Sequence, residues 1–295
     1  MSAASITRVG LIAKRRLDAA AGALAELAGW LEARSLRPVF ETHTAALAGL
    51  PPGRPTSEAD DLPSACDLVV VLGGDGTLIG MAGRIARAGV DVPILGVNFG
   101  SLGFLTEITL DELYPSLEAV LDGRATIEPR MMLAARTIRA GQTFSDHVVL
   151  NDIVITKGAL SRIVEMDVTV GEQAVTRVRA DGLILATPTG STAYNLAAGG
   201  PIVHPAVDAL LLTPIAPHTL TNRPIVIPAA SDVHVRPVMN GNDEIFVTFD
   251  GQSGFPLQAD DHVTVRRAER ALRLVKSPSR SYFELLREKM KWGGR

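Results

Sequence analysis

The chain has 295 residues, 46 % of them hydrophobic, a formal net charge of −3 and a single cysteine, Cys66. This length favours two domains over one core, and the charge provides no basic field that would attract nucleic acid or an anionic membrane. One cysteine excludes an intrachain disulfide, and we find neither a signal-peptide pattern nor an apolar run of transmembrane length, so we expect a cytoplasmic protein.

Strands and helices alternate in the first part of the chain. This alternation predicts a parallel, Rossmann-like sheet with right-handed crossovers, whose ligands bind at the carboxyl ends of the strands. The expected strands are 8–13, 38–40, 67–72 and 93–97, the expected helices are 17–33, 77–88 and 110–121, and 47–63 is expected to be a loop.

The pattern changes near Ile127, where two-residue alternation and glycine turns replace the helices. This change favours a β-rich, sandwich-like domain. Its expected strands are 132–139, 146–156, 163–170, 172–179, 224–228, 233–237, 245–250 and 262–267. One helix returns at the end, and Ser281 with Glu284 forms its capping box. We therefore expect an α/β domain over 1–126, a β-rich domain over 127–270 and a C-terminal segment over 271–295.

The most informative motif is the turn Gly73-Gly74-Asp75-Gly76-Thr77, directly after an apolar strand. Glycines let the backbone approach a ligand closely, and the amides that open a helix can bind phosphate oxygens. A carboxylate inside a phosphate site suggests that it holds a divalent cation or takes a proton from a hydroxyl. The alternative is an ordinary structural turn. The chain has no P-loop, and the Rossmann glycine fingerprint lacks its third glycine.

A second motif runs from Asp181 to Asn195 and has five hydroxyl side chains within positions 187–194. Such groups are suited to the ribose hydroxyls or the adenine edge of a ligand. One of Thr189, Ser191 and Thr192 is expected to cap a helix. The ring of Tyr194 is suited either to stacking on a base or to packing.

A third motif is Asn151-Asp152, two polar residues within the apolar strand predicted over 146–156. Buried polar groups need partners, so the pair marks either a ligand site or a bulge or turn in the strand.

Together the three motifs resemble the bacterial ATP/polyphosphate-dependent NAD kinase family. The resemblance extends over nearly the whole chain and includes residues 213–218, 223–224 and 250–252. It implies a kinase that transfers a phosphoryl group from ATP to the 2′-hydroxyl of the adenosine ribose of NAD, giving NADP, with a divalent cation such as Mg²⁺. It also implies a C-terminal helix that packs on the first domain, and a homodimer or homotetramer.

The resemblance also implies roles for individual residues. Asp75 matches the proton acceptor of the family. Many relatives have Glu where Asp152 stands, so the reach of that carboxylate is shorter here. Arg162 and Arg179 are suited to binding diphosphate, although exposed strand arginines are commonly only solvated. The implied nucleotide-binding residues are Gly73, Gly74, Asp75, Gly76, Asn151, Asp152, Arg162, Arg179, Asp181, Thr192, Ala193, Tyr194, Asn195, Leu196, Ala197 and Gln252.

Two other functions compete with this hypothesis. A lipid kinase of the diacylglycerol type shares the glycine turn, but the chain has no basic amphipathic segment for a membrane surface. A non-catalytic NAD sensor would keep residues 187–194 without needing Asp75.

Overall fold

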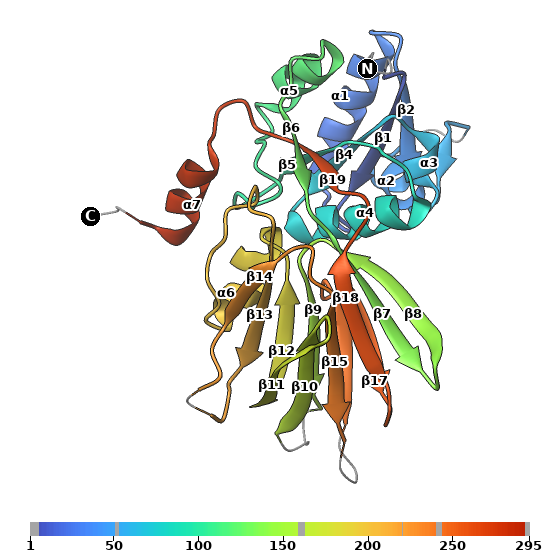
Figure 1. Ribbon diagram of the computed structural model, residues 1–295. Helices are drawn as coiled ribbons and strands as arrows, with labels where there is room; N and C mark the ends of the chain where they lie inside the picture. Colours follow the sequence, from blue (N-terminus) through green and yellow to red (C-terminus); the bar gives the residue numbers. More distant parts are fainter. Residues whose placement is uncertain (1–5, 51–52, 159–162, 220, 240–243, 293–295) are drawn as a thin grey trace. The chain divides into compact units, whose positions relative to one another are not determined.

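The computed structural model describes residues 6–50, 53–158, 163–219, 221–239 and 244–292. The chain forms two compact units (Figure 1). Unit 1 comprises Met1–Pro129 and Leu272–Arg295, and unit 2 comprises Arg130–Ala271. The predicted fold class is confirmed, because unit 1 has a mostly parallel sheet with helices and unit 2 has two antiparallel sheets. None of the helices described is both long and apolar enough to span a membrane.

The sheet of unit 1 has seven strands in the order β3-β2-β1-β4-β5-β19-β6. Strands β1 to β5 and β19 pair in parallel. The predicted strand at 8–13 is confirmed. The strands are β1 (Arg8–Ala13), β2 (Arg37–Glu41), β3 (Thr56–Ser57), β4 (Leu68–Gly73), β5 (Ile94–Asn98), β6 (Ile127–Arg130) and β19 (Leu272–Val275).

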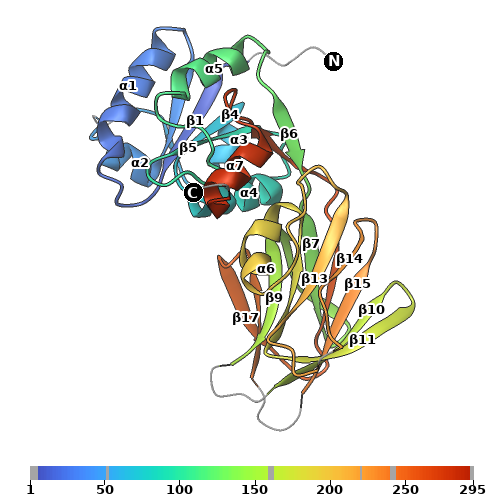
Figure 2. The ribbon, with the colours of Figure 1, turned by 90° about the vertical axis from the view of Figure 1, so that its left-hand side faces the viewer.

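Helices cover both faces of this sheet (Figure 2). Leu68, Val70 and Leu72 of β4 belong to the same buried cluster as residues of α1 and α5. Because side chains alternate along a strand, Val69 and Val71 point to the opposite face, where α4 packs. The helices are α1 (Ala20–Glu32), α2 (Thr42–Leu47), α3 (Leu62–Ala65), α4 (Asp75–Ala88), α5 (Leu113–Leu121) and α7 (Tyr282–Met290).

Strand β1 lies between β2 and β4, so the strand order changes direction there. In an open α/β sheet, ligands bind outside the carboxyl ends of the strands at such a switch point. The residues at these two carboxyl ends are Lys14, which follows β1, and Gly73, which ends β4.

Unit 2 is a pair of six-stranded antiparallel sheets, with orders β11-β10-β15-β18-β7-β8 and β14-β13-β12-β9-β16-β17. The first contains β7 (Leu133–Arg139), β8 (Gln142–Val149), β10 (Val164–Val170), β11 (Gln173–Ala180), β15 (Val233–Val238) and β18 (His262–Arg267). The second contains β9 (Asp152–Lys157), β12 (Gly182–Ala186), β13 (Ala209–Ile215), β14 (Ile225–Pro228), β16 (Ile245–Phe249) and β17 (Ser253–Leu257).

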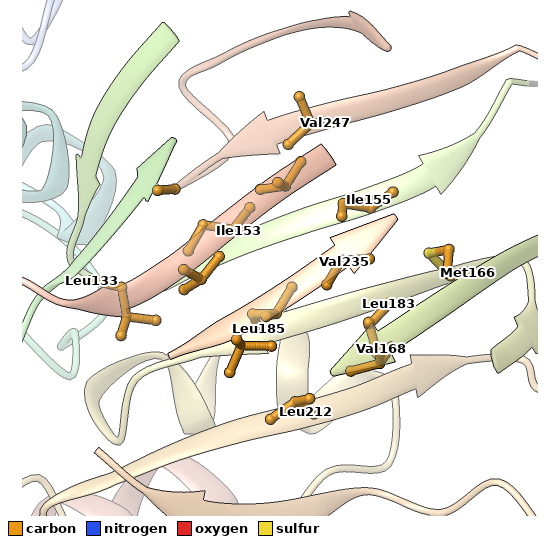
Figure 3. Close-up of a cluster of buried hydrophobic side chains, with 14 of the residues drawn as sticks. Leu133, Ile153, Ile155, Met166, Val168, Leu183, Leu185, Leu212, Val235 and Val247 are labelled. Carbon is orange, nitrogen blue, oxygen red and sulfur yellow. The ribbon is translucent and has the colours of Figure 1, made fainter. Parts of the chain in front are cut away.

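The core of unit 2 lies between the two sheets. Figure 3 shows Met166 and Val168 of one sheet in the same cluster as Ile153, Leu183 and Leu212 of the other. On its other face, the second sheet buries a smaller cluster beneath the segment that contains α6 (Tyr194–Ala197). Strands β9 and β12 are therefore buried on both faces, which explains their continuous apolar sequences.

Two predictions about secondary structure are wrong. Residues 146–156 are not one strand: β8 ends at Val149 and β9 begins at Asp152, in different sheets. Asn151 and Asp152 lie where the chain passes from one sheet to the other. The predicted loop over 47–63 contains β3 and the start of α3, which are too short to show a periodic pattern. Strands β6, β13, β17 and β19 were also not predicted.

Candidate active site

The glycine turn of unit 1 lies between a buried strand and a helix. Strand β4 is buried throughout, and α4 begins at Asp75 with Gly74 as an extended N-cap. A Cβ at Gly73 would lie 3.0 Å from Oγ1 of Thr77 and 3.1 Å from Cβ of Lys14. A side chain at this position would therefore require its neighbours to shift by a few tenths of an ångström. The amides of Thr77 and Leu78 donate to the carbonyl of Gly74 (3.0 and 3.3 Å). The amides of Asp75 and Gly76 precede these first bonds of the helix and are suited to an anion.

The carboxylate of Asp75 binds the turn that follows β5. Oδ1 accepts hydrogen bonds from the amide of Leu105 (3.1 Å) and from the amide and hydroxyl of Thr106 (both 2.9 Å). Oδ2 accepts one from the amide of Phe104 (2.8 Å). A Cβ at Gly103 would overlap Oδ1, so only glycine permits this approach. These contacts fix the carboxylate in one orientation.

A second carboxylate, Asp250, organises the candidate site of unit 2. It accepts hydrogen bonds from the amides of Leu150 (2.8 Å), Asn151 (2.7 Å) and Asp152 (3.1 Å). Asp250 has a left-handed backbone conformation, with φ of 51°. Its side chain thereby holds the chain where it passes between the sheets.

Asp152 is nearly buried, with 5 % of its surface exposed. The pKa of its carboxyl is raised to about 7, mainly by burial and in smaller part by the negative charge of the nearby Asp250. Burial also raises the pKa of Asp250, against the opposing effect of its three amide donors. A buried carboxyl whose pKa lies near neutrality is typical of a functional site.

The hydroxyl-rich loop binds mainly to itself. Oγ1 of Thr187 donates to the carbonyl of Leu150 (2.6 Å) and accepts from the amide of Gly190 (3.0 Å). Oγ of Ser191 contacts the carbonyls of Pro188 (2.6 Å) and Val203 (3.1 Å) and accepts from the amide of Val203 (3.0 Å). These two hydroxyls hold the loop in place. The sequence could not distinguish this role from ligand binding.

The expected helix cap is wrong. The 3₁₀ turn Thr189–Thr192 and α6 have Pro188 and Ala193 at their N-caps, and neither cap makes a side-chain hydrogen bond. The backbone at Ala193 is neither helical nor extended, which separates the two short helices.

Asn195 is fully buried and its amide is occupied. Nδ2 donates to the carbonyls of Ser191 and Pro201 (both 3.0 Å), and Oδ1 accepts from the hydroxyl of Thr213 (2.6 Å). A Cβ at Gly200 would overlap this amide. Asn195 therefore links both ends of the loop to β13.

Other predicted residues of unit 2 present accessible groups. Tyr194 is 46 % exposed. Arg179 pairs with its cross-strand neighbour Glu165 (Nε–Oε1 3.0 Å), and Asp181 pairs with Lys157 (3.2 Å). Arg162 lies outside the described residues. Thr192, Leu196, Ala197 and Gln252 are also at least partly exposed, as are Gly74, Asp75 and Gly76 in unit 1.

Sequence reasoning missed the residues that hold these sites. Thr106 and Gly103 secure Asp75, and Asp250 secures Asn151 and Asp152. Asp250 lies in the segment 250–252 that shares the family resemblance, but its own sequence signal was an Asp-Gly pair after a strand, which is typical of a turn. Its partners lie 98 to 100 positions earlier in the chain.

Comparison with known proteins decides the family. The ATP-NAD kinase N-terminal domain matches residues 9–125, and the ATP-NAD kinase C-terminal domain matches residues 150–277. The chain belongs to the ATP-NAD kinase family. The prediction of a NAD kinase is therefore confirmed at the level of the family and its enzyme class.

Relatives and solved structures agree with this assignment. The NAD kinase of Geobacter sulfurreducens is 50 % identical over 288 residues, covering 98 % of this chain and 99 % of the relative. That of Magnetococcus marinus is 44 % identical over 285 residues, covering 96 % and 93 %. Yeast NADH kinase complexed with NADH aligns with a TM-score of 0.88 at 26 % identity, covering 99 % of this chain and 89 % of that one. An NAD kinase from Archaeoglobus fulgidus in complex with ATP shares the fold, with a TM-score of 0.75 at 22 % identity, covering 96 % and 98 %.

Proposed function

We propose that this protein transfers the terminal phosphoryl group of ATP to the 2′-hydroxyl of the adenosine ribose of NAD, giving NADP and ADP. Family membership supports the substrates. The main structural support for the reaction is the carboxylate of Asp75, which hydrogen bonds hold in one orientation within a glycine-rich turn of the kind that binds phosphate. A non-catalytic sensor would need that carboxylate only to hold residues 104–106.

Oδ2 of Asp75 is the oxygen that we propose takes the proton. Among the described residues it accepts one hydrogen bond, whereas Oδ1 accepts three. A carboxylate oxygen has two acceptor sites, so Oδ2 retains one for a hydroxyl. As the proton passes from the 2′-hydroxyl to Oδ2, the ribose oxygen bonds to the terminal phosphorus. The bond from that phosphorus to ADP breaks, and ADP leaves with the electron pair.

The described residues do not form a dedicated metal cage. No three His, Cys, Asp or Glu side chains within the described ranges are placed to hold an ion. Oδ1 of Asp75 is already occupied by three donors. Mg²⁺ in nucleotide sites is commonly held by phosphates and water, with few protein ligands. Mg²⁺ is therefore expected to accompany ATP, held mainly by its phosphates and by water.

NAD is proposed to bind through residues of unit 2. The carboxylate of Asp152 has no hydrogen-bond donor among the described residues and is suited to a hydroxyl or amide of the dinucleotide. Asn151 lies beside it, and the exposed ring of Tyr194 offers a face for a base. Arg179 and Asp181 are proposed contacts, together with Gln252, Thr192, Ala193, Leu196 and Ala197, whereas the buried side chain of Asn195 is proposed to hold the loop that carries them. Self-association into a homodimer or homotetramer stays a prediction from the resemblance.

The test is formation of NADP from NAD, ATP and Mg²⁺ by the wild type and by Asp75→Asn. We expect kcat to fall by about 10²–10⁴-fold in the variant, the usual loss for a positioned general base. Diacylglycerol replaces NAD in a parallel assay, and phosphorylation of that lipid without NADP formation would identify a lipid kinase instead.

Asp67→Asn is the matched control. Asp67 precedes the other end of β4 and also accepts four hydrogen bonds, from Thr7 and Arg8. We expect this variant to keep its kcat. Equal losses in both variants, or full activity of Asp75→Asn, would contradict the role of Asp75 as a base.

A further inference from the structure

A pocket of about 420 Å³ lies at the carboxyl end of β1, in unit 1. None of the residues that line this pocket has been given a role in the site described above. Three consecutive cations line it, and no ion pair within the described ranges involves them. The main polar lining residues are Lys14, Arg15, Arg16, Asp18, His43 and Thr44.

The pocket wall is held firmly. The amide of Ala13 donates to Oγ1 of Thr44 (2.9 Å), and that hydroxyl donates to the buried carboxylate of Glu41 (2.7 Å). Glu41 also accepts from the amide of Thr44 (2.8 Å) and caps α2. Strand β1 and helix α2 are therefore tied together, and the exposed cations extend from a rigid base.

The pocket adjoins the glycine turn. The amide of Lys14 donates to the carbonyl of Leu72 (2.9 Å), and Cβ of Lys14 lies against Gly73. Lys14 and Gly73 follow the two strands at the switch point of the sheet, where ligands of open α/β sheets bind. An anion in the pocket would therefore extend toward the amino end of α4 and Asp75.

We propose that Lys14, Arg15 and Arg16 bind the phosphates of the phosphoryl donor. The ligand is a polyphosphate chain, either the triphosphate of ATP or inorganic polyphosphate. The inference rests on the proposed function and adds the donor subsite to it. A chain of net charge −3 repels such an anion overall, so binding requires a local cluster of cations. The turn at Asp75 then holds the phosphoryl group that is transferred, while the three cations hold the rest of the chain.

Kinetics of Lys14→Gln and Arg15→Gln test the subsite. At saturating NAD, we expect each substitution to raise KM for ATP about three- to tenfold, as for one lost charge-assisted contact. KM for NAD should not change. Raising the salt concentration should raise KM for ATP more steeply in the wild type than in the double variant, because the lost contacts are screened by salt.

Arg37→Gln is the matched control. Arg37 is exposed at the amino end of β2, whereas the pocket lies at the carboxyl end of the neighbouring parallel strand β1. The variant should leave KM for ATP unchanged. A second series with inorganic polyphosphate distinguishes the sources. A raised KM for both donors indicates recognition of the shared phosphate chain, and a raised KM for one identifies that donor. An unchanged KM for both, or an equal rise in Arg37→Gln, overturns the proposal.

Calorimetry separates failure of the subsite from failure of the proposed function. If the wild type makes no NADP, the proposed function fails, and binding of ATP to the wild type and the double variant is then compared directly. Tighter binding to the wild type supports the anion subsite, whereas equal affinities overturn it.

Discussion

At the scale of single residues, the buried carboxyl of Asp152 is predicted to make the stability of the protein depend on pH. Its pKa of about 7 lies well above the ordinary aspartate value of 3.8, because burial and Asp250 both disfavour the charged form. The folded state therefore binds its proton more tightly than the unfolded state does. The resulting penalty is absent below about pH 4, grows as the pH rises, and is complete above about pH 7.

We predict that Asp152→Asn raises the free energy of unfolding at pH 8 by about 2–4 kcal/mol, the value of a shift of this size. The gain should disappear near pH 4. Urea unfolding of the wild type and of Asp152→Asn between pH 4 and 8 measures this gain in stability. Asp146 is an exposed carboxylate on β8, so Asp146→Asn should show no comparable gain. A gain of equal size at pH 4 would show that packing, not charge, is responsible.

At the scale of elements, a buried ion pair ties the C-terminal segment to the turn that holds Asp75. Nζ of Lys276, just after β19, lies 2.8 Å from Oε2 of Glu107, and their side chains are 7 % and 0 % exposed. The amide of Ser277 donates to the other oxygen of Glu107 (3.0 Å). Glu107 follows Thr106, which donates two hydrogen bonds to Asp75. The segment after Leu272 thus supports the residue proposed as the base.

We predict that Lys276→Met lowers the free energy of unfolding by about 3–5 kcal/mol, because it leaves a buried carboxylate without its counter-charge. Adding Glu107→Gln should recover part of this loss. Arg273→Met, three residues earlier on β19, is the control, since its pair with Asp91 is exposed and contributes at most about 1 kcal/mol. Urea midpoints measure all four proteins, and a double variant no more stable than Lys276→Met would contradict the argument.

The same contacts show which features a sequence can predict. The apolar run of β4 and the capping box of Ser281 were predictable, because each depends on residues close together in the chain. The partners of Asp75 were not, since three of its four donors are backbone amides, which every sequence has. The break at Asn151 was also hidden, because the polar pair alone does not show that Asp250 binds there.

At the scale of the whole molecule, the proposed substrate contacts are divided between two compact units. The residues proposed for the donor, from Lys14 to Thr77, belong to unit 1, and most of those proposed for NAD belong to unit 2. A ligand that binds only the folded protein stabilises it by about 2.7 kcal/mol when the ligand concentration is 100 times its Kd. Its contacts also slow the exchange of amide hydrogens near the binding site. Each substrate alone should therefore protect a different part of the chain.

Hydrogen exchange measured with one substrate at a time tests this division. We predict that ATP with Mg²⁺ protects residues 13–16 and 73–77, and that NAD protects residues 150–152 and 187–197. In the Lys14→Gln/Arg15→Gln variant, protection by ATP should weaken while protection by NAD stays. Identical patterns for the two substrates would contradict the division, because they would place both ligands on one set of residues. Separate patterns would show that each unit recognises its substrate by its own contacts, as the positions of Asp75 in unit 1 and Asp152 in unit 2 lead us to expect.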